Sequence, residues 1–412
     1  MDPRKVGTLL GLFGATFAIR FGVWSLVASN HMPTLFDEGG YWERAQAFRR
    51  LDWRTFYGEG MWPPLHSSIL AAASTVEGAR LINVLVASLT AIPLYLLSSK
   101  LGGNRAGIVS VLAFAVYPVF VAFSHLLWSE SLFSLLLVTA VYLFVLLRES
   151  GRLQWAVALG IDLGLLGLTR SSAVPYFLVF SLLLLLARQT RPAAVVAALS
   201  LLLWLPWLIT LRIQEGRTVL LATGNGYNLY LGNNPYLPLW SADKTTGVEP
   251  NTTLFYRHLD TIGGKGGLAA KDVAARAEAV EFIRAFPGLF LRRCAERLGD
   301  FASPDYFVRR HFEFGLYPPQ WNKERVVLVD AIGHWLILAL GLAGIGFLPG
   351  HRALFAALIA AGSIFPVVSI VPSRVNIPTL ILLTIPAGVT ATRLAMRWTR
   401  RKTWQIEPAG SD

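Results

Sequence analysis

Charged residues are scarce in this sequence. Asp, Glu, Lys and Arg make up only 15% of the 412 residues, whereas 54% of the residues are hydrophobic. Because soluble domains are about one quarter charged, this composition excludes an ordinary soluble protein. Together with a mean hydropathy of +0.51, it predicts an integral membrane protein.

Cysteine is represented only once, by Cys294. A single cysteine excludes an intrachain disulfide and a cysteine-based metal site. The formal net charge of +12 would be typical of a nucleic-acid-binding protein, but the Lys and Arg residues stand at the ends of apolar runs and form no single basic face. We therefore expect no nucleic-acid partner.

Long apolar runs dominate what is present. A helix needs about 20 mostly apolar residues to cross a bilayer, and we expect an all-α polytopic protein with about ten transmembrane helices. The expected helices are at 6–28, 81–99, 105–122, 130–147, 153–168, 173–187, 193–211, 326–347, 352–371 and 376–396. The fifth and sixth are short, and Gly164, Gly167 and Pro175 predict a broken or tilted pair. The first run is longer than a signal-peptide core, so we expect an uncleaved first span.

Basic residues distinguish the two sides of the membrane. If the N-terminus is cytoplasmic, the short outer hairpins hold only Arg170 and Arg374. The short inner segments then hold Arg4, Lys5, Lys100, Arg105, Arg148, Arg152, Arg188, Arg191, Arg352, Arg393, Arg397, Arg400, Arg401 and Lys402. The positive-inside rule predicts this asymmetry.

This orientation defines the expected domains. Residues 1–211 form an N-terminal transmembrane module with an outer loop at 29–80. Residues 212–325 form an outward-facing, partly helical domain, in which 225–235 is rich in turn residues and helices are expected at 269–285 and from Pro287. Residues 326–412 hold the last transmembrane helices and a basic cytoplasmic tail.

Carboxylates mark the outer side. Asp37 and Glu38 directly follow the first apolar run, at the water–lipid boundary. Asp37 has two possible roles. It is a general base that faces a membrane-embedded donor, or it acts together with Glu38 as a cap for the helix that begins near Tyr41. Glu130 stands at the outer end of the fourth run, where a carboxylate is costly and usually has a partner or a task; its alternative role is that of an anion at a helix N-terminus.

Arginines form a second group on the same side, namely Arg20, Arg80, Arg170 and Arg374. Because the positive-inside rule disfavours cations in outer hairpins, a phosphate bound there would compensate them. The alternatives are snorkelling to lipid headgroups and pairing with Asp37 or Glu130.

Histidines supply a further alternative. His66 and His125 belong to the outer side, and a divalent metal held by Glu130 with His125 stays open, although the spacing matches no established metal motif. No other cofactor is indicated.

Acidic side chains that lie beside cationic ones at a bilayer surface are suited to one reaction in particular. This reaction is the transfer of a sugar from a polyprenyl-phosphate carrier to a hydroxyl. The carrier phosphate leaves as an anion and needs no proton, so one carboxylate base is enough, unlike the pair used in glycoside hydrolysis. Such a base accelerates transfer by about 10²–10⁴-fold. The alternative is a transporter or flippase of lipid-linked sugars, which tends to bury charges at mid-membrane and to show repeated halves; no repeat is evident here.

Several short segments, taken in order, resemble the polytopic glycosyltransferases of the GT-C fold, specifically the protein mannosyltransferase and lipid A aminoarabinose transferase group. The segments are Phe36-Asp37-Glu38 with Tyr41, Pro63-Pro64-Leu65, Arg80-Leu81-Ile82-Asn83, Ser129-Glu130-Ser131-Leu132-Phe133, Gly167-Leu168-Thr169-Arg170, Gly226-Tyr227-Asn228-Leu229-Tyr230-Leu231-Gly232-Asn233-Asn234-Pro235 and Arg374-Val375-Asn376-Ile377-Pro378. Two departures are Trp62, where many relatives have a histidine, and the lack of the large C-terminal soluble domain that some relatives carry.

The resemblance implies roles for individual residues. Asp37 matches the catalytic acid, Glu38 supports it, Glu130 shapes the site or touches a metal, and Arg374 holds the carrier phosphate. Further substrate contacts are expected from Arg170, Arg80, Arg20, Tyr41, His66, Tyr227 and Asn233. The implied partners are a dolichyl- or undecaprenyl-phosphate sugar, a lipid, glycan or protein acceptor, and membrane lipids. The implied reaction inverts the anomeric centre, on the outer face of the cytoplasmic membrane.

Overall fold

The computed structural model describes residues 3–28, 37–58, 60–236, 258, 261–262, 267–304, 307–369 and 376–404, with side chains to residue 399. All regular elements in these ranges are helices. They are α1 (Pro3–Ala28), α2 (Glu38–Arg49), α3 (Trp53–Tyr57), α4 (Leu65–Leu70), α5 (Val76–Leu89), α6 (Ala91–Gly102), α7 (Asn104–Val116), α8 (Pro118–Ser124), α9 (Glu130–Ser150), α10 (Leu153–Thr169), α11 (Ala173–Leu186), α12 (Thr190–Glu215), α13 (Asn225–Gly232), α15 (Leu268–Ala285), α16 (Pro287–Ala302), α17 (Phe307–Glu313), α18 (Lys323–Ile345), α19 (Arg352–Val368) and α20 (Ile377–Trp404).

A helix lies at each of the ten expected transmembrane positions. Six described helices are long and apolar enough to cross a membrane, counting α5 and α6 as one continuous helix. The chain is therefore an integral membrane protein, and its all-α class is confirmed. Helices α10, α11 and α19 are apolar but have only 17, 14 and 17 residues, so the number of complete crossings remains a prediction.

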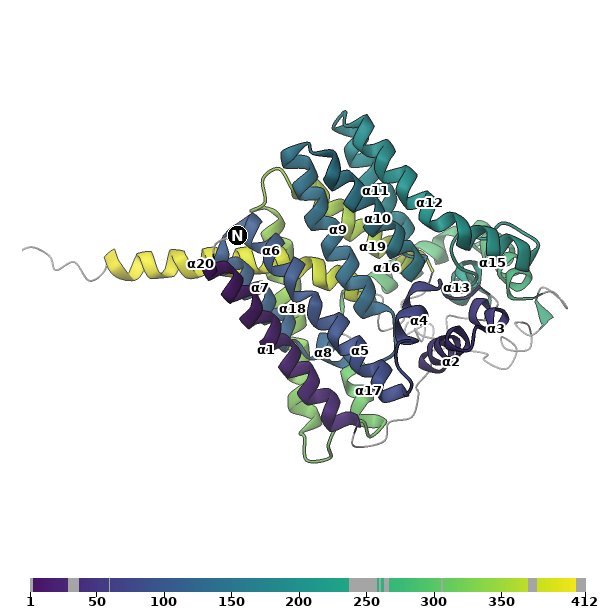
Figure 1. Ribbon diagram of the computed structural model, residues 1–412, viewed down its shortest axis with the longest axis horizontal. Helices are drawn as coiled ribbons and strands as arrows, with labels where there is room; N and C mark the ends of the chain where they lie inside the picture. Colours follow the sequence, from purple (N-terminus) through teal and green to yellow (C-terminus); the bar gives the residue numbers. More distant parts are fainter. Residues whose placement is uncertain are drawn as a thin grey trace, which may run out of the picture.

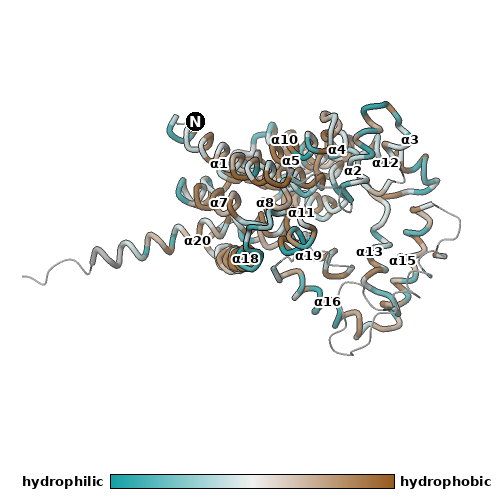
Figure 2. Tube along the Cα trace, turned by 90° about the horizontal axis from the view of Figure 1, so that it is seen from below, coloured by the Kyte–Doolittle hydropathy of each residue, from teal (hydrophilic) through white to brown (hydrophobic). Residues whose placement is uncertain are grey.

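The arrangement separates two ends of the molecule. Helices α2, α3, α13 and α15 gather at the end opposite the N-terminus, while α20 projects from the N-terminal side (Figure 1). Hydrophobic residues are concentrated in the helices between these ends, around α1, α5, α7 and α8 (Figure 2). The candidate site is built at the first of these ends.

The third expected span is broken. Helices α7 and α8 meet at an angle of 63°, because Tyr117 is extended and Pro118 opens the new helix. The carbonyls at the end of α7 are satisfied by the fully buried Arg20, whose Nη2 atom donates to Phe114 O at 3.0 Å. The first turn of α8 is capped by Asp330 of α18, whose Oδ1 atom accepts from Val119 N at 3.1 Å. Arg20 thus stabilises the break, and its expected contact with substrate remains a prediction.

The turn-rich segment after α12 is helical, contrary to expectation. Helix α13 begins after Gly224, which has a positive φ of 102°. Asp272 of α15 accepts from Gly226 N at 2.7 Å and from Tyr227 N at 3.0 Å. The capping residue lies 45 residues away along the chain. Rules based on neighbouring residues cannot include such a contact, so the sequence predicted a turn-rich segment where the structure has a helix. The expected helices α15 and α16 are confirmed.

Glycines allow two spans to approach closely. Gly164 and Gly167 of α10 face Trp204 of α12, whose Nε1 atom donates to Gly164 O at 2.9 Å. A Cβ atom on Gly167 would lie 2.2 Å from Trp204 Nε1. Helix pairs in membranes commonly use small residues in this way.

The substitution Gly167→Ala should therefore destabilise the protein by about 1–3 kcal/mol, because the buried Trp204 has no room to move. Gly11→Ala on α1 is the control, since no atom lies within 4 Å of its new methyl group. Thermal unfolding in detergent measures both. Equal midpoints for the two variants would contradict this account of the α10–α12 contact.

Candidate active site

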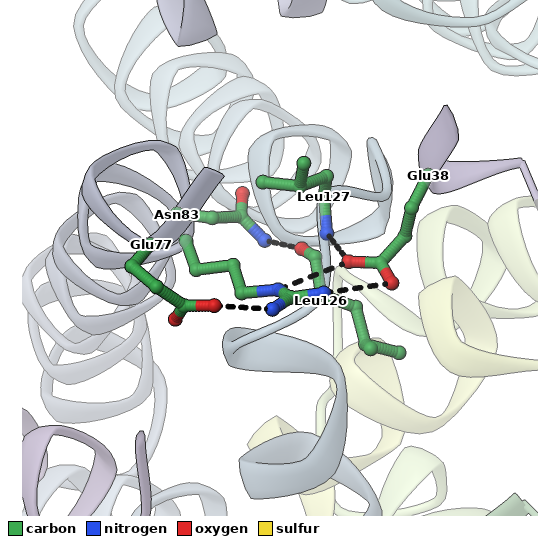
Figure 3. A network of polar contacts seen from close by, with 6 residues as sticks. Glu38, Glu77, Asn83, Leu126 and Leu127 are labelled. Atoms are coloured by element: carbon green, nitrogen blue, oxygen red, sulfur yellow. Dashed lines mark hydrogen bonds and ion pairs between the residues drawn. The ribbon is translucent and has the colours of Figure 1, made fainter. Parts of the chain in front are cut away.

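A non-helical segment, residues 125–129 between α8 and α9, is the centre of the site. It is buried, so its backbone groups need partners within the protein. Leu127 N donates to Glu38 Oε1 at 2.8 Å, Leu127 O contacts His66 Nε2 at 3.2 Å, and Leu126 O accepts from Asn83 Nδ2. Side chains from α2, α4 and α5 thereby fix this segment, as Figure 3 shows for Glu38 and Asn83.

Glu38 is held by a buried ion pair. Its side chain is fully buried and accepts from Arg80 Nη2 at 3.3 Å and from Arg80 Nε at 3.4 Å. Arg80 also contacts Glu77 Oε1 at 2.6 Å (Figure 3). These contacts give Glu38 and Arg80 a positioning role; the catalytic role expected of Glu38 and the substrate binding expected of Arg80 remain predictions.

Glu130 and Arg170 form the second ion pair, 2.7 Å apart. Glu130 opens α9 and is 3% exposed, whereas Arg170 is 25% exposed. Arg170 Nη1 also donates to Ser129 Oγ at 3.0 Å, and Ser129 Oγ contacts Tyr41 OH at 2.9 Å. The pairing of arginine with Glu130, left open from the sequence, is therefore present.

Asp37 stands immediately before α2. Its backbone carbonyl accepts from Tyr41 N at 3.1 Å, but its side chain makes no capping hydrogen bond. The capping alternative thus does not account for its carboxylate. Residues four apart share a helix face, so Asp37 lies on the side on which Tyr41 reaches Ser129, and it is partly exposed there.

His66 packs against the ring of Tyr41. The two rings meet edge to face with centroids 5.1 Å apart, and Trp62 packs against Tyr41 at 5.1 Å. Desolvation by burial lowers the pKa of His66 to about 4, so its imidazole is neutral at pH 7. Because Nε2 faces the carbonyl of Leu127 it carries the proton, and Nδ1 is an acceptor with no hydrogen-bond partner in the described part of the chain.

Comparisons with known proteins agree with this architecture. A model of the dolichyl-phosphate-mannose-protein mannosyltransferase family matches residues 63–210. The crystal structure of the apo oligosaccharyltransferase of Archaeoglobus fulgidus aligns with a TM-score of 0.55 and 14% identity, covering 98% of this chain and 52% of that one. The chain has the GT-C fold.

Two further structures illustrate the range of GT-C similarity. The Archaeoglobus fulgidus oligosaccharyltransferase AglB in complex with an inhibitory peptide and a dolichol-phosphate has a TM-score of 0.54 and 14% identity, with 100% of this chain and 53% of that chain covered. ArnT from Cupriavidus metallidurans bound to undecaprenyl phosphate has a TM-score of 0.45 and 13% identity, with 96% and 79% covered. The chain spans about half the length of the archaeal structures. No curated protein matches the sequence.

His125, the first residue of the 125–129 segment, packs toward α17. Its ring meets His311 of α17 at 5.4 Å and Tyr317 at 6.5 Å, and burial together with His311 lowers its pKa well below the usual range. Across the described ranges, no three His, Cys, Asp or Glu side chains gather as metal ligands. The metal that Glu130 and His125 are expected to hold remains a prediction.

The remaining expected residues divide into framework and undescribed positions. Asn233 is fully buried and donates to Leu229 O and Val368 O at 2.9 and 2.8 Å, and its Oδ1 accepts from Arg297 at 3.1 Å. Asn233 thus joins α13 to α16 and α19, whereas Tyr227, whose N–H donates to Asp272, joins α13 to α15. Arg374 lies outside the described residues.

Sequence reasoning quoted Asn83 and Ser129 within motifs but assigned them no role. Asn83 holds the 125–129 segment and Ser129 links Tyr41 to Arg170. A polar residue in the first turns of an apolar span was the signal that could have identified Asn83.

The two carboxylates that meet Arg80 should differ in their effect on stability. Glu38→Gln leaves a buried guanidinium with one partner fewer and should cost about 3 kcal/mol or more. Glu77→Gln is the matched control: Glu77 is 37% exposed, so its loss should cost below about 1 kcal/mol. Thermal unfolding in detergent compares them, and equal losses would contradict a positioning role for Glu38.

The neutral state of His66 predicts a pH dependence. The pKa of His66 is about 4 in the folded protein and 6.5 when unperturbed, so the unfolded chain binds the extra proton between these values. Stability should therefore fall as the pH drops from 6.5 to 4, by on the order of 3 kcal/mol. Unfolding midpoints over this range should fall less for His66→Gln, and parallel curves would contradict the assignment.

Proposed function

We propose that this chain is an inverting glycosyltransferase, which moves a sugar from a polyprenyl-phosphate donor to a hydroxyl of a lipid, glycan or protein acceptor. One observation carries the proposal. A partly exposed carboxylate, Asp37, which makes no capping bond, lies on the helix face where Tyr41 meets Ser129, next to the Glu130–Arg170 pair.

The comparisons support the same class of chemistry. The matching family model describes dolichyl-phosphate-mannose-protein mannosyltransferases, and the archaeal oligosaccharyltransferase was obtained with a dolichol-phosphate. Both names point to lipid-phosphate carriers. The donor and acceptor of this chain remain part of the proposal.

Asp37 acts as the base. The acceptor oxygen attacks the anomeric carbon from the face opposite the phosphate, so the configuration inverts. As the new bond forms, the acceptor proton moves to the Asp37 carboxylate, and the electron pair of the broken C–O bond leaves on the carrier phosphate. A carboxylate of ordinary acidity cannot deprotonate an alcohol beforehand, but it can accept the proton in the transition state.

Arg170 stabilises the leaving phosphate. Its Nη1 atom makes both the Glu130 and the Ser129 contact, and the described residues offer no partner to its other two nitrogens. A guanidinium held from one side can donate to phosphate oxygens from the other. Glu130 then sets the position of Arg170, and we expect Arg374 to complete the phosphate site.

The site faces outward in this proposal. The basic residues listed above put the N-terminus in the cytoplasm under the positive-inside rule. The candidate residues gather at the opposite end of the molecule (Figure 1). We therefore expect the reaction on the outer face of the cytoplasmic membrane.

Asp37→Asn should reduce sugar transfer by about 10²–10⁴-fold, because the amide cannot accept the proton, while donor binding stays nearly unchanged. Purified protein, a radiolabelled polyprenyl-phosphate sugar and a panel of acceptors provide the assay. The control is Glu43→Gln, which neutralises an exposed carboxylate on the same helix and should keep full activity.

Arg170→Ala provides the complementary result in the same assay, since loss of a phosphate ligand should weaken donor binding as well as turnover.

Full turnover by Asp37→Asn would remove the base assignment. Movement of the lipid-linked sugar across vesicles without transfer would favour the transporter alternative.

A further inference from the structure

Helix α16 has an unusual distribution of side chains. Leu291 and Leu298, seven residues apart and therefore on one face, are 65% and 53% exposed. Phe286, directly before the helix, is 53% exposed. The opposite face is buried and carries Arg293 and Arg297. A helix surrounded by water normally shows the reverse pattern.

The buried arginines explain why the inner face is polar. Arg297 donates to Gly232 O at 2.6 Å and to Val367 O at 2.9 Å, and Arg293 donates to Asn234 O at 3.1 Å. These carbonyls belong to the ends of α13 and α19. The arginines therefore satisfy two helix termini, and the face of α16 that remains outside is apolar.

The position of α16 indicates what covers this face. It packs against α19, Arg297 reaches the carboxyl end of that helix, and Figure 2 shows α16 near α19 at the edge of the molecule. Helix α19 is itself apolar and exposes Ile364 to the extent of 59%. The exposed side chains of α16 thus continue the apolar surface of α19.

We propose that α16 is an interfacial membrane helix. Phe286, Leu291 and Leu298 contact the acyl chains of the leaflet around the carboxyl end of α19. Two exposed arginines are close to this stripe in sequence: Arg284 at the end of α15, and Arg292 of α16, which also pairs with Glu296 at 3.2 Å. They contact lipid phosphates, as basic residues beside an interfacial apolar face do. This lipid contact anchors the outer helices α13 and α15 relative to the spans, through Arg293 and Arg297, and does not depend on the proposed activity.

The single cysteine of the chain makes a direct test practical. In a Cys294→Ser background, spin labels are attached after Leu291→Cys or Leu298→Cys, and the protein is reconstituted in phosphatidylethanolamine–phosphatidylglycerol vesicles. Two reference sites are Ala277→Cys, exposed on α15, and Leu202→Cys, exposed on the spanning helix α12. Collisions with oxygen, which partitions into lipid, and with a water-soluble nickel chelate are measured at each site.

Labels at 291 and 298 should have an oxygen-to-nickel accessibility ratio several-fold above that at 277, and below that at 202, which lies in the middle of α12. A ratio equal to that at 277 would place the stripe in water and overturn the proposal. Protection from both reagents would indicate contact with protein, such as a second copy of the chain, and would overturn it equally. Because two positions are labelled, a folding defect in one variant leaves the other informative.

Discussion

The structure depends on satisfying the backbone of residues 125–129 away from water. A chain that leaves its helical path at membrane depth exposes N–H and C=O groups, and each one is costly unless it is paired. Glu38, His66 and Asn83 come from three different helices to provide these partners. The polar side chains that resemble a catalytic cluster in the sequence are, in large part, the partners of one irregular segment.

This constraint separates the roles of two adjacent carboxylates. Glu38 points into the protein, where Arg80 and Leu127 occupy its oxygens, and it fixes the start of α2. Asp37 precedes it by one residue and is left partly exposed. Fixing the first acid therefore orients the second, which is the arrangement a base needs to meet a hydroxyl in a defined direction.

The expectations from sequence succeeded where the signal is local. Apolar runs located the six described helices that are long and apolar enough to cross a membrane, and Pro287 located the start of α16. The acidic pair, Glu130 and Arg170 were identified because charges are expensive at a membrane boundary. The high cost of a buried charge does not by itself distinguish a charge that binds substrate from one that satisfies a backbone group, and Arg20 and Glu38 both contact backbone groups here. Helix α13 was missed because its cap, Asp272, comes from another helix.

A charged residue within a membrane span can serve as a partner for the backbone. Arg20 and Asp330 lie on separate helices, α1 and α18, and they serve the two sides of one break. Arg20 donates to the last carbonyls of α7, and Asp330 accepts from the first turn of α8. The break in turn directs α8 toward the segment that carries Ser129 and Glu130. Two costly charges inside the membrane thus support an irregular backbone, and that backbone presents the Glu130–Arg170 pair at the place where α2 begins.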